Sequence, residues 1–317
     1  MKRHWQAAMI RLAESPRAKR WAQTFAETSS LAKRYVGGAG AGEAVATARR
    51  LLDERAIRSS LFYLGEYVNT PELVVENVEA KLAAAAALGP EGLDVHVSVD
   101  PTQVGLGLDP ELARRNVARI GEAIGEASRG RPGVHCLMLD MEDSGVTDAT
   151  IAMHAALVEA GAPAALTLQA YRRRTEADLA PLIRSGAKVR LVKGAFAEGP
   201  ELAFTRRDEI KANSRLLIDR MLSREARDHG FYPIVATHDD RLHAYARERA
   251  AANGWAQGEY EFEMLLGVRS DVAEALAAQG ERVRLYVPFG RDWWPYAVRR
   301  IGENPANAWL LARSAMG

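Results

Sequence analysis

The feature that most constrains the fold of this chain is a strand-then-helix unit that recurs eight times along most of its 317 residues. Each unit has a short apolar run followed by an alanine-rich, charged stretch of helical length. The apolar runs predict strands at 60–64, 93–99, 134–139, 164–168, 187–192, 232–236, 260–264 and 283–287. Eight strands that alternate with helices over about 250 residues predict a (β/α)8 barrel of the TIM type. An open doubly wound sheet is the second choice, because no strand leads into a convincing phosphate-binding glycine turn.

Composition allows a large core but does not select a function. The hydrophobic share is 48%, and a formal net charge of +1 gives no electrostatic reason to expect a nucleic-acid partner. The single cysteine, Cys136, excludes an intrachain disulfide and a cysteine metal cluster, as in a reducing compartment. No run approaches the ~20 apolar residues of a membrane span, and the N-terminus lacks the apolar core of a signal peptide. We therefore expect a soluble, cytoplasmic protein.

The first 35 residues differ from the rest of the chain. They contain eight basic and two acidic residues, a local charge of +6, on segments with helical spacing. Such an arm can pack on its own domain, which we expect first, or lie peripherally on an anionic inner-membrane surface. The glycine-rich stretch 37–42 has no strand before it, so we interpret it as a flexible joint ahead of a helix at 43–55. The expected division is a helical arm and joint, 1–42, and a barrel domain, 43–317.

Polar residues directly follow most of the predicted strands. The strands of such a barrel are parallel, so the carboxyl ends of all of them lie at one rim. Residues that follow the strands therefore converge on one site. They include Glu66, Asp100, Asp140, Glu142, Gln169, Lys193, His238 and Asp239. A single polar residue at a strand end is commonly a solvated loop residue. We expect a functional site here only because several such residues meet at the same rim.

Two chemistries could use this rim. One is metal-assisted hydrolysis or aldol chemistry, with the ligands Asp140, Glu142, His238 and Asp239. Its weakness is the supply of histidine, since no HxH or HExxH spacing occurs. The other needs a large anionic cofactor across the rim, held by Arg190, Lys193 and backbone amides. Gly194 suits this second chemistry, because a missing side chain lets the main chain approach a cofactor closely.

The last fifty residues contain a candidate carboxylate clamp. If 293–304 is helical, Arg299 and Arg300 lie one turn beyond Tyr296, and Glu303 lies one turn beyond both arginines. Paired guanidiniums present rigid forks of donors that match two carboxylate oxygens. The alternative is a solvated basic helix end, which is the commoner meaning of an isolated Arg-Arg pair.

Several motifs resemble, in the same order, those of the proline dehydrogenase family. They are RLVKGAF at 190–196, ATHD at 236–239, EFEMLLGV at 261–268 and RLYVP at 284–288, followed by Arg299 and Arg300. LGE at 64–66, DMED at 140–143 and LQAY at 168–171 extend the resemblance over most of the chain. It implies a distorted (β/α)8 barrel that binds FAD, with the last helix over the rim. It also implies oxidation of L-proline to Δ1-pyrroline-5-carboxylate by hydride transfer to flavin N5, with electrons passed to a quinone.

The resemblance further implies roles for individual residues. The flavin contacts would be Met141, Gln169, Arg190, Val192, Lys193, Gly194, Ala195, Thr205, Arg206, Thr237, His238, Glu263, Arg300 and Glu303. The substrate residues would be Asp140, Leu265, Tyr286 and Tyr296 around the ring, Arg299 and Arg300 on the carboxylate, Glu66 as gate partner of Arg299, and Asp100. Two alternatives stay open: a flavin-dependent dehydrogenase of another cyclic or N-alkylated amino acid, and a non-catalytic flavin-binding regulatory protein.

Four positions depart from the family pattern. An acid replaces the usual lysine, asparagine or glutamine at three of them, and phenylalanine replaces tyrosine at the fourth: Asp100, Asp239, Glu263 and Phe196. A reversed charge in a poorly hydrated pocket would cost about 1 to 3 kcal/mol of substrate binding. Alternatively, Asp100 pairs with Arg190 or Lys193 and the pocket stays balanced. We expect proline to remain the substrate, bound more weakly than in typical members.

Overall fold

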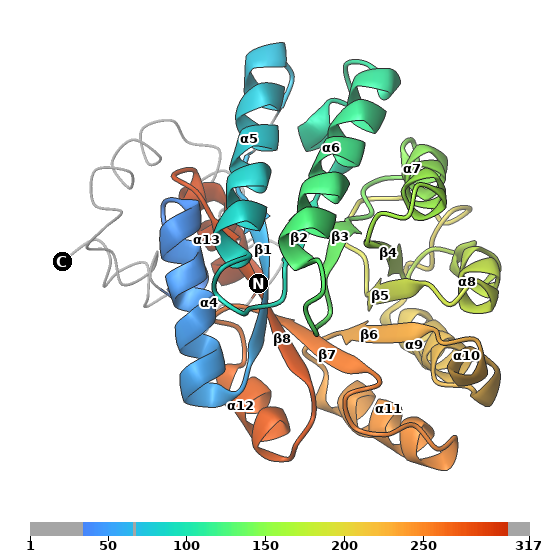
Figure 1. Cartoon of the computed structure of the whole chain (residues 1–317). Coiled ribbons are helices and arrows are strands. Elements are labelled where there is room, and N and C mark those ends of the chain that lie inside the picture. Colours follow the sequence, from blue (N-terminus) through green and yellow to red (C-terminus); the bar gives the residue numbers. More distant parts are fainter. Residues whose placement is uncertain (1–33, 66–67, 304–317) are drawn as a thin grey trace.

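Eight parallel strands pair in sequence order and close into a barrel, as predicted (Figure 1). This computed structural model describes residues 34–65 and 68–303, without the side chains of residues 299 and 301–303. The strands are β1 Arg58–Tyr63, β2 His96–Val99, β3 Cys136–Leu139, β4 Ala164–Gln169, β5 Lys188–Val192, β6 Tyr232–Ala236, β7 Glu261–Leu265 and β8 Val283–Phe289. Pairing of β1 with β8, from Arg58↔Arg284 to Tyr63↔Phe289, closes the ring.

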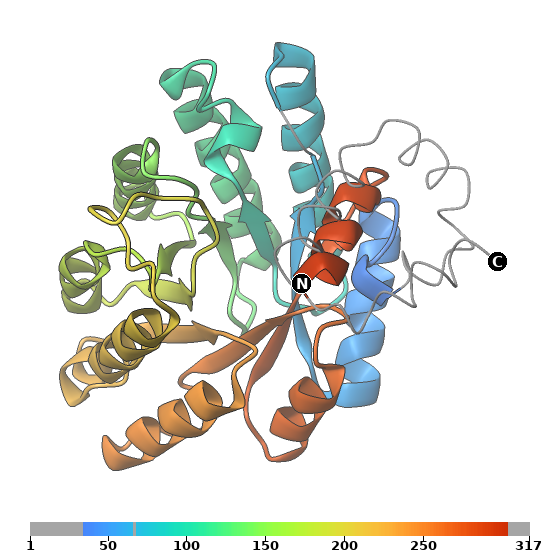
Figure 2. The same cartoon turned by 180° about the vertical axis from the view of Figure 1, so that it is seen from behind.

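Helices surround the barrel on its outside (Figures 1 and 2). They are α4 Ala41–Arg55, α5 Pro71–Leu88, η1 Pro101–Val104, α6 Pro110–Ser128, α7 Thr147–Glu159, α8 Thr175–Arg184, α9 Arg207–Met221, α10 Arg224–Asp228, α11 Asp240–Ala252, α12 Ser270–Ala278 and α13 Trp293–Glu303. Side-chain caps start several of them: Thr70 and Asp109 accept hydrogen bonds from the first turns of α5 and α6, each with proline next in the chain. Among the described helices none has the length and apolarity needed to cross a bilayer.

Strands β2 and β3 are shorter than predicted, because side chains satisfy the backbone before them. Predicted to begin at 93 and 134, they begin at His96 and Cys136. The Asp94 carboxylate accepts a hydrogen bond from the amide of Val134 at 3.1 Å, and the ring of His135 accepts one from the amide of Val95 at 2.9 Å. These bonds replace ladder bonds, so the regular strand starts later.

The stretch predicted to be a flexible joint is fixed to the end of β8, so that prediction is wrong. The amide of Gly37 donates to the carbonyl of Pro288 at 2.7 Å, and the amide of Gly290 donates to the carbonyl of Gly38 at 2.9 Å. Helix α4 then begins at Ala41, inside the segment assigned to the joint. Backbone hydrogen bonds of this kind are not visible in composition, which shows only that glycine can adopt many conformations. The predicted arm at 1–33 lies outside the described residues.

Charged side chains fill the lower layer of the barrel interior. The guanidinium of Arg284 is fully buried and donates to Glu261 Oε1 at 2.7 Å, to Asp94 Oδ2 at 2.7 Å and to the carbonyl of Ser59 at 2.8 Å. Burial alone would lower the pKa of Arg284, but the two carboxylates hold that pKa well above its ordinary value. Side chains two residues further along β7 and β8 form the next layer up, toward the strand ends.

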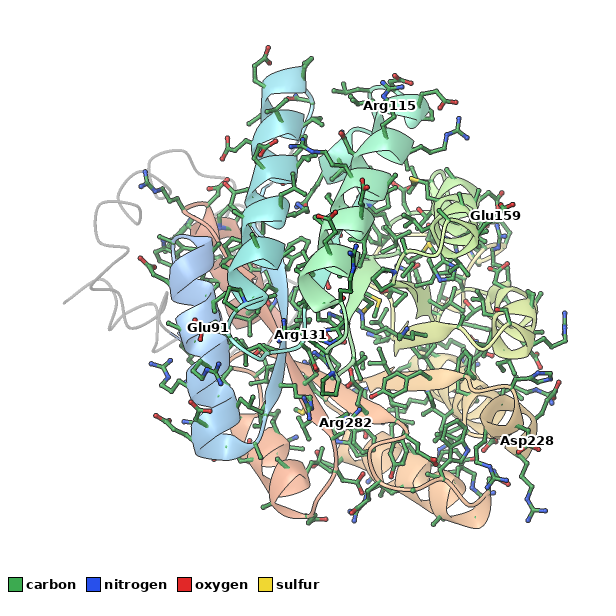
Figure 3. The ribbon with its side chains drawn as sticks, in the orientation of Figure 1. Glu91, Arg115, Arg131, Glu159, Asp228 and Arg282 are labelled. Carbon is green, nitrogen blue, oxygen red and sulfur yellow. The ribbon has the colours of Figure 1, made fainter. Side chains whose placement is uncertain are left out.

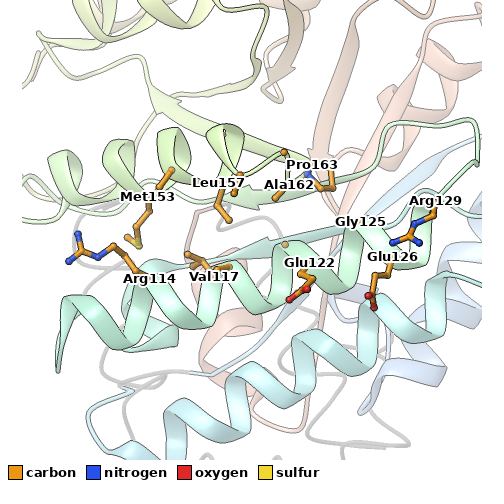
Figure 4. A pocket seen from close by; sticks show the side chains of 15 residues that line it. Arg114, Val117, Glu122, Gly125, Glu126, Arg129, Met153, Leu157, Ala162 and Pro163 are labelled. Atoms are coloured by element: carbon orange, nitrogen blue, oxygen red, sulfur yellow. The ribbon is translucent and has the colours of Figure 1, made fainter.

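Outside the barrel, α6 and α7 enclose a groove of about 560 Å³, which is seen from close by in Figure 4. Gly121 and Gly125 on α6 and Ala162 and Pro163 before β4 contribute to its lining. The groove lies between helices, away from the strand ends. Charged residues such as Glu159 and Asp228 project from the outer ring (Figure 3). The candidate site must therefore be sought at the rim.

Candidate active site

Arg190 on β5 is the centre of a buried polar cluster near the strand ends. Its Nε donates to Thr167 Oγ1 at 3.0 Å, and its Nη1 donates to Glu263 Oε1 at 2.9 Å and to Ser98 Oγ at 3.4 Å. Its Nη2 pairs with the carboxylate of Asp140. The guanidinium is therefore fixed by groups from β2, β3, β4 and β7 and cannot swing.

Asp140 and Tyr286 face each other across this cluster. The hydroxyl of Tyr286 donates to Asp140 Oδ2 at 3.0 Å, while Thr167 Oγ1 donates to Asp140 Oδ1 at 3.0 Å. The guanidinium carbon of Arg190 lies 5.3 Å from the centroid of the Tyr286 ring. Burial, and next the carboxylate of Asp100, raise the pKa of Tyr286 well above its ordinary value. The phenol therefore stays protonated and serves as a donor.

Buried polar atoms without a described hydrogen-bond partner occur at the ends of β4 and β6. Gln169 donates through Nε2 to the carbonyl of Met141 at 2.9 Å, but its Oε1 has no such partner. His238 Nε2 accepts from the amide of Leu265 at 3.5 Å, and its Nδ1 has none. Burial, and next the charge of Arg300, lower the pKa of His238 to about 4, so the ring is neutral at physiological pH. With Nε2 as acceptor, the proton belongs on Nδ1, a donor directed at no described acceptor.

The loop after β5 is held close to the end of β4. Gly194 has φ +96°, and a Cβ there would meet the ring of Tyr171 at 2.1 Å. Glu198 accepts from Arg172 Nη1 at 2.7 Å and from the amide of Ser144 at 2.8 Å, in a nearly buried arrangement. The ring of Tyr171 occupies the space that a side chain at position 194 would need, so packing within the protein also requires this glycine.

The remaining predicted flavin residues occupy different environments. Lys193 and Ala195 are exposed, and Val192 and Thr237 are half-buried. Thr205 and Arg206 are exposed, and Arg206 pairs with Asp208 at 2.6 Å at the start of α9. Thr205 and Arg206 therefore lie in a solvated segment, apart from the residues at the strand ends.

Helix α13 reaches the rim, as predicted. Figure 2 shows it beside α4, next to β1 and β8. Its Tyr296 is buried, and the guanidinium carbon of Arg300 lies 5.2 Å from the centroid of the Tyr296 ring. Tyr296 contributes to the raised pKa of Tyr286, and Arg300 contributes to the lowered pKa of His238, so both act on the strand-end cluster. Glu66 and the side chains of Arg299 and Glu303 lie outside the described part of the chain.

The three unusual acids have different partners. Glu263 accepts from Arg190 and from Ser60 Oγ at 2.7 Å. Asp239 accepts from the amide of Arg241 at 3.1 Å, at the start of α11, and pairs with Lys211 at 2.5 Å. The predicted pairing of Asp100 with Arg190 or Lys193 is wrong, because Arg190 is directed to Asp140 and Glu263 while Lys193 is exposed.

The charge of Asp100 acts on two neighbouring ionisable groups, Glu142 and Lys81. Glu142 accepts from the amide of Thr102 at 2.9 Å and from its hydroxyl at 2.5 Å. Burial, and next the charge of Asp100, raise the pKa of Glu142 to about 7. A wholly buried ammonium, that of Lys81, also interacts with Asp100. Sequence reasoning missed Lys81, because a lysine in an alanine-rich helix looks like a solvated residue.

The four side chains considered as metal ligands, Asp140, Glu142, His238 and Asp239, do not form a metal site in the described part of the chain. Within residues 34–65 and 68–303, no cluster of histidine, cysteine, aspartate or glutamate side chains could hold a metal ion. Asp140 is bound by Arg190 and Tyr286, and Asp239 is bound by Lys211. Sequence reasoning also missed Ser60, Ser98 and Thr167; their signal is a small hydroxyl residue at an inward position inside an otherwise apolar strand.

Comparison with known proteins adds the decisive observation: the sequence model described as "Proline dehydrogenase" matches residues 44–313. The chain belongs to the proline dehydrogenase family. It is therefore an oxidoreductase. The proline dehydrogenase of Deinococcus radiodurans is 34% identical over 317 residues, covering 98% of each chain. Proline dehydrogenase 2 of Bacillus subtilis strain 168 is 30% identical over 292 residues, covering 92% of this chain and 90% of its own.

Solved structures agree with this assignment at the level of the fold. Proline utilization A of Bdellovibrio bacteriovorus, inactivated by N-propargylglycine, superposes with a TM-score of 0.77 at 21% identity over 89% of this chain. Proline utilization A of Corynebacterium freiburgense gives a TM-score of 0.72 at 22% identity over 98% of this chain. This chain spans 34% of the length of each of those two proteins. The comparison shows that the chain shares the barrel fold of these proteins.

Proposed function

We propose that this member of the proline dehydrogenase family oxidises L-proline to Δ1-pyrroline-5-carboxylate with FAD as cofactor and a quinone as electron acceptor. The observation that carries the proposal is the shared carboxylate of Asp140, which binds Arg190 and Tyr286 at the strand ends beside α13. A small zwitterionic ligand at this site would meet the fixed carboxylate of Asp140, the protonated phenol of Tyr286 and the aromatic side chain of Tyr296 on α13.

The residues at the rim fit a flavin. The isoalloxazine ring has both donors and acceptors along its edge, and the rim offers the unpartnered Oε1 of Gln169, Oε2 of Glu263 and Nδ1–H of His238. Neutral His238 is suited to donate to a ring carbonyl. When bound, FAD supplies the hydride acceptor and the route for electrons to the quinone.

The binding residues that we propose keep their expected roles. Met141, Gln169, Arg190, Val192, Lys193, Gly194, Ala195, Thr237, His238, Glu263, Arg300 and Glu303 would hold the flavin, and Thr205 with Arg206 its adenylate end. The exposure of Thr205 and Arg206 is compatible with a solvated phosphate or adenine contact.

The substrate would lie between α13 and the strand ends. Arg299 and Arg300 would bind its carboxylate, with Glu66 as the gate partner of Arg299. Asp140, Leu265, Tyr286 and Tyr296 would surround the ring. Arg190 keeps Asp140 in place by charge and by hydrogen bonding, so this carboxylate can face a secondary ammonium without moving. Exclusion of water by the buried Tyr296 would strengthen these interactions.

The test is identification of the product. Purified protein is incubated with FAD, L-proline and a soluble quinone, and an aromatic amine traps any cyclic imine for mass spectrometry. We expect an imine two mass units lighter than proline. No imine from proline, but an imine from another cyclic or N-alkylated amino acid, would contradict the substrate assignment.

Quinone use gives the basic arm a possible role in contact with an anionic membrane surface. The test compares the full chain with a variant lacking residues 1–35 in flotation with anionic liposomes. We expect the deletion to abolish liposome binding, and equal binding of both proteins would refute the membrane role.

A further inference from the structure

The carboxylate of Glu198 joins the three loops that follow β3, β4 and β5. Its Oε1 accepts hydrogen bonds from Arg172 Nη1 at 2.7 Å and from the amide of Ser144 at 2.8 Å, and its Oε2 accepts one from Ser144 Oγ at 2.9 Å. Ser144 belongs to the loop after β3, Arg172 to the loop after β4 and Glu198 to the loop after β5. One side chain therefore links three neighbouring strand ends.

We refer to the contacts of Glu198 with Arg172 and Ser144 as the clamp, and its ion pair is almost entirely shielded from solvent. The side chains of Arg172 and Glu198 are 5% and 6% exposed. Removal of one partner of such a pair leaves the other charge buried without compensation, which is unfavourable. The clamp therefore holds the loops far more firmly than an exposed ion pair would.

Glu198 lies between two backbone attachments of its own loop. Near the start of this loop, the amide of Tyr171 donates to the carbonyl of Lys193 at 3.0 Å, and near its end the amide of Phe204 donates to the carbonyl of Tyr171 at 2.7 Å. Residues 195–197 between these attachments are exposed. Glu198 thus attaches the middle of the loop, and through Ser144 it also reaches the loop after β3.

Each residue of the clamp lies three positions beyond a residue to which we assign a flavin contact. The spacing is the same in all three loops: Met141 to Ser144, Gln169 to Arg172 and Ala195 to Glu198. Two of these assigned residues also contact each other, since Gln169 Nε2 donates to the carbonyl of Met141 at 2.9 Å. A change in the separation of the loops at the clamp would therefore change the relative positions of the residues assigned to the cofactor.

We propose that Glu198 is a positioning residue for cofactor binding: through Arg172 and Ser144 it fixes the three loops, before FAD binds, in the arrangement that FAD requires. The inference rests on the proposed function in one respect, that FAD lies across these strand ends. A preformed site binds its ligand more tightly, because less conformational entropy is lost when the ligand enters. Asp140 has its own hydrogen bonds to Thr167 and Tyr286, so the substrate residues depend less on the clamp.

The test measures the Kd for FAD by calorimetric titration of the full-length apoprotein. Glu198→Ala removes all three contacts and should raise this Kd roughly tenfold. Glu198→Gln keeps an acceptor for Arg172 and for the Ser144 amide, and its own amide group can donate to the Ser144 hydroxyl, so its Kd should stay within threefold of the natural value. Glu201→Ala, which removes an exposed carboxylate from the same loop, is the matched control and should leave the Kd unchanged. Equal Kd values for Glu198→Ala and Glu201→Ala would overturn the proposal.

Two further measurements separate positioning from stability. Ser144→Ala removes the hydroxyl bond and leaves the buried ion pair intact, so it should fold normally and raise the Kd for FAD about threefold. Urea unfolding of the apoproteins should show that Glu198→Gln is less stable than the natural protein, since Arg172 then faces a neutral group, although this variant binds FAD well. A Kd for FAD that rises in parallel with the loss of stability across these variants would show a structural role only.

Steady-state kinetics at saturating FAD complete the test. The KM for proline should stay within twofold of the natural value in Glu198→Ala, and a tenfold rise would overturn the assignment of the clamp to the cofactor. Natural protein that binds no FAD would contradict the proposed function and this inference together. Tight FAD binding by the natural protein and by both alanine variants, Glu198→Ala and Glu201→Ala, would overturn this inference alone.

Discussion

Arg190 stacks on the face of Tyr286, with 5.3 Å between the guanidinium carbon and the ring centroid, and both side chains bind the carboxylate of Asp140. The two residues come from β5 and β8, on different sides of the barrel. Three side chains thus fix one another, so the position of the Asp140 carboxylate is set by the barrel rather than by a loop.

Removal of the Asp140 charge should impair catalysis more than folding. In Asp140→Asn, Arg190 and Tyr286 keep a polar neighbour, but a charge-assisted hydrogen bond worth about 1.5 to 3 kcal/mol is lost. We expect kcat/KM for proline to fall roughly tenfold to hundredfold. Steady-state kinetics with Asp143→Asn, an exposed position in the same loop, as control would check this. Equal losses in the two variants would contradict the assigned role.

Gly194 should not tolerate a side chain. Alanine there would meet the Tyr171 ring at 2.1 Å and hold an unfavourable φ of +96°. We expect Gly194→Ala to destabilise the loop by about 1 to 3 kcal/mol, seen as faster proteolytic cleavage in 193–206. Gly107→Ala, where no atom lies within 4 Å, is the matched control. Partial rescue by a second change, Tyr171→Ala, would identify the ring as the cause.

The buried cluster of Arg284, Glu261 and Asp94 below the site should support stability but not catalysis. Arg284→Met leaves the carboxylate of Glu261 buried without its cation and leaves Asp94 with Arg58 alone, at a cost of about 3 to 5 kcal/mol. Arg55→Met, which breaks an exposed pair with Glu274, should cost at most about 1 kcal/mol. Urea unfolding gives both values. A KM for proline that changes with Arg284 in the folded protein would show that the two layers are coupled.

Stability should decrease as the pH falls from about 6.5 toward 4. Burial lowers the pKa of His154 and of His238 to about 4, so in this range the unfolded chain binds protons that the folded chain excludes. Each histidine can contribute up to about 3 kcal/mol, and Glu142, with a raised pKa, partly opposes this trend. Urea unfolding of His154→Gln between pH 4.5 and 7 should show a shallower pH dependence than unfolding of the natural protein. An unaltered slope in His154→Gln would be inconsistent with a neutral buried ring.

The fold was predictable because each strand and helix follows a local pattern. All eight strands occur where apolar runs predicted them, and the helix at Trp293–Glu303 agrees closely with its prediction. The errors come from long-range bonds: the link between Gly37 and Pro288 joins residues far apart in the sequence, and no local pattern reveals it. The late start of β3 has the same origin, in the side chain of Asp94.

The site was predictable in part for a similar reason. Strand ends identify Asp140, Gln169 and His238, because a barrel brings those positions together. The ion pairs of the site could not be predicted. Arg190 pairs with Asp140 and Glu263 and not with Asp100, because pairing depends on the directions of side chains inside the barrel. Lys81 was overlooked because its burial depends on how α5 packs against η1.

The most direct test of the central claim is the visible spectrum of the purified protein during anaerobic addition of L-proline. We predict a flavin absorption band near ~450 nm that disappears on addition of L-proline and returns when a quinone is added. Protein that binds no added FAD, or a flavin band that persists at saturating L-proline, would contradict the account.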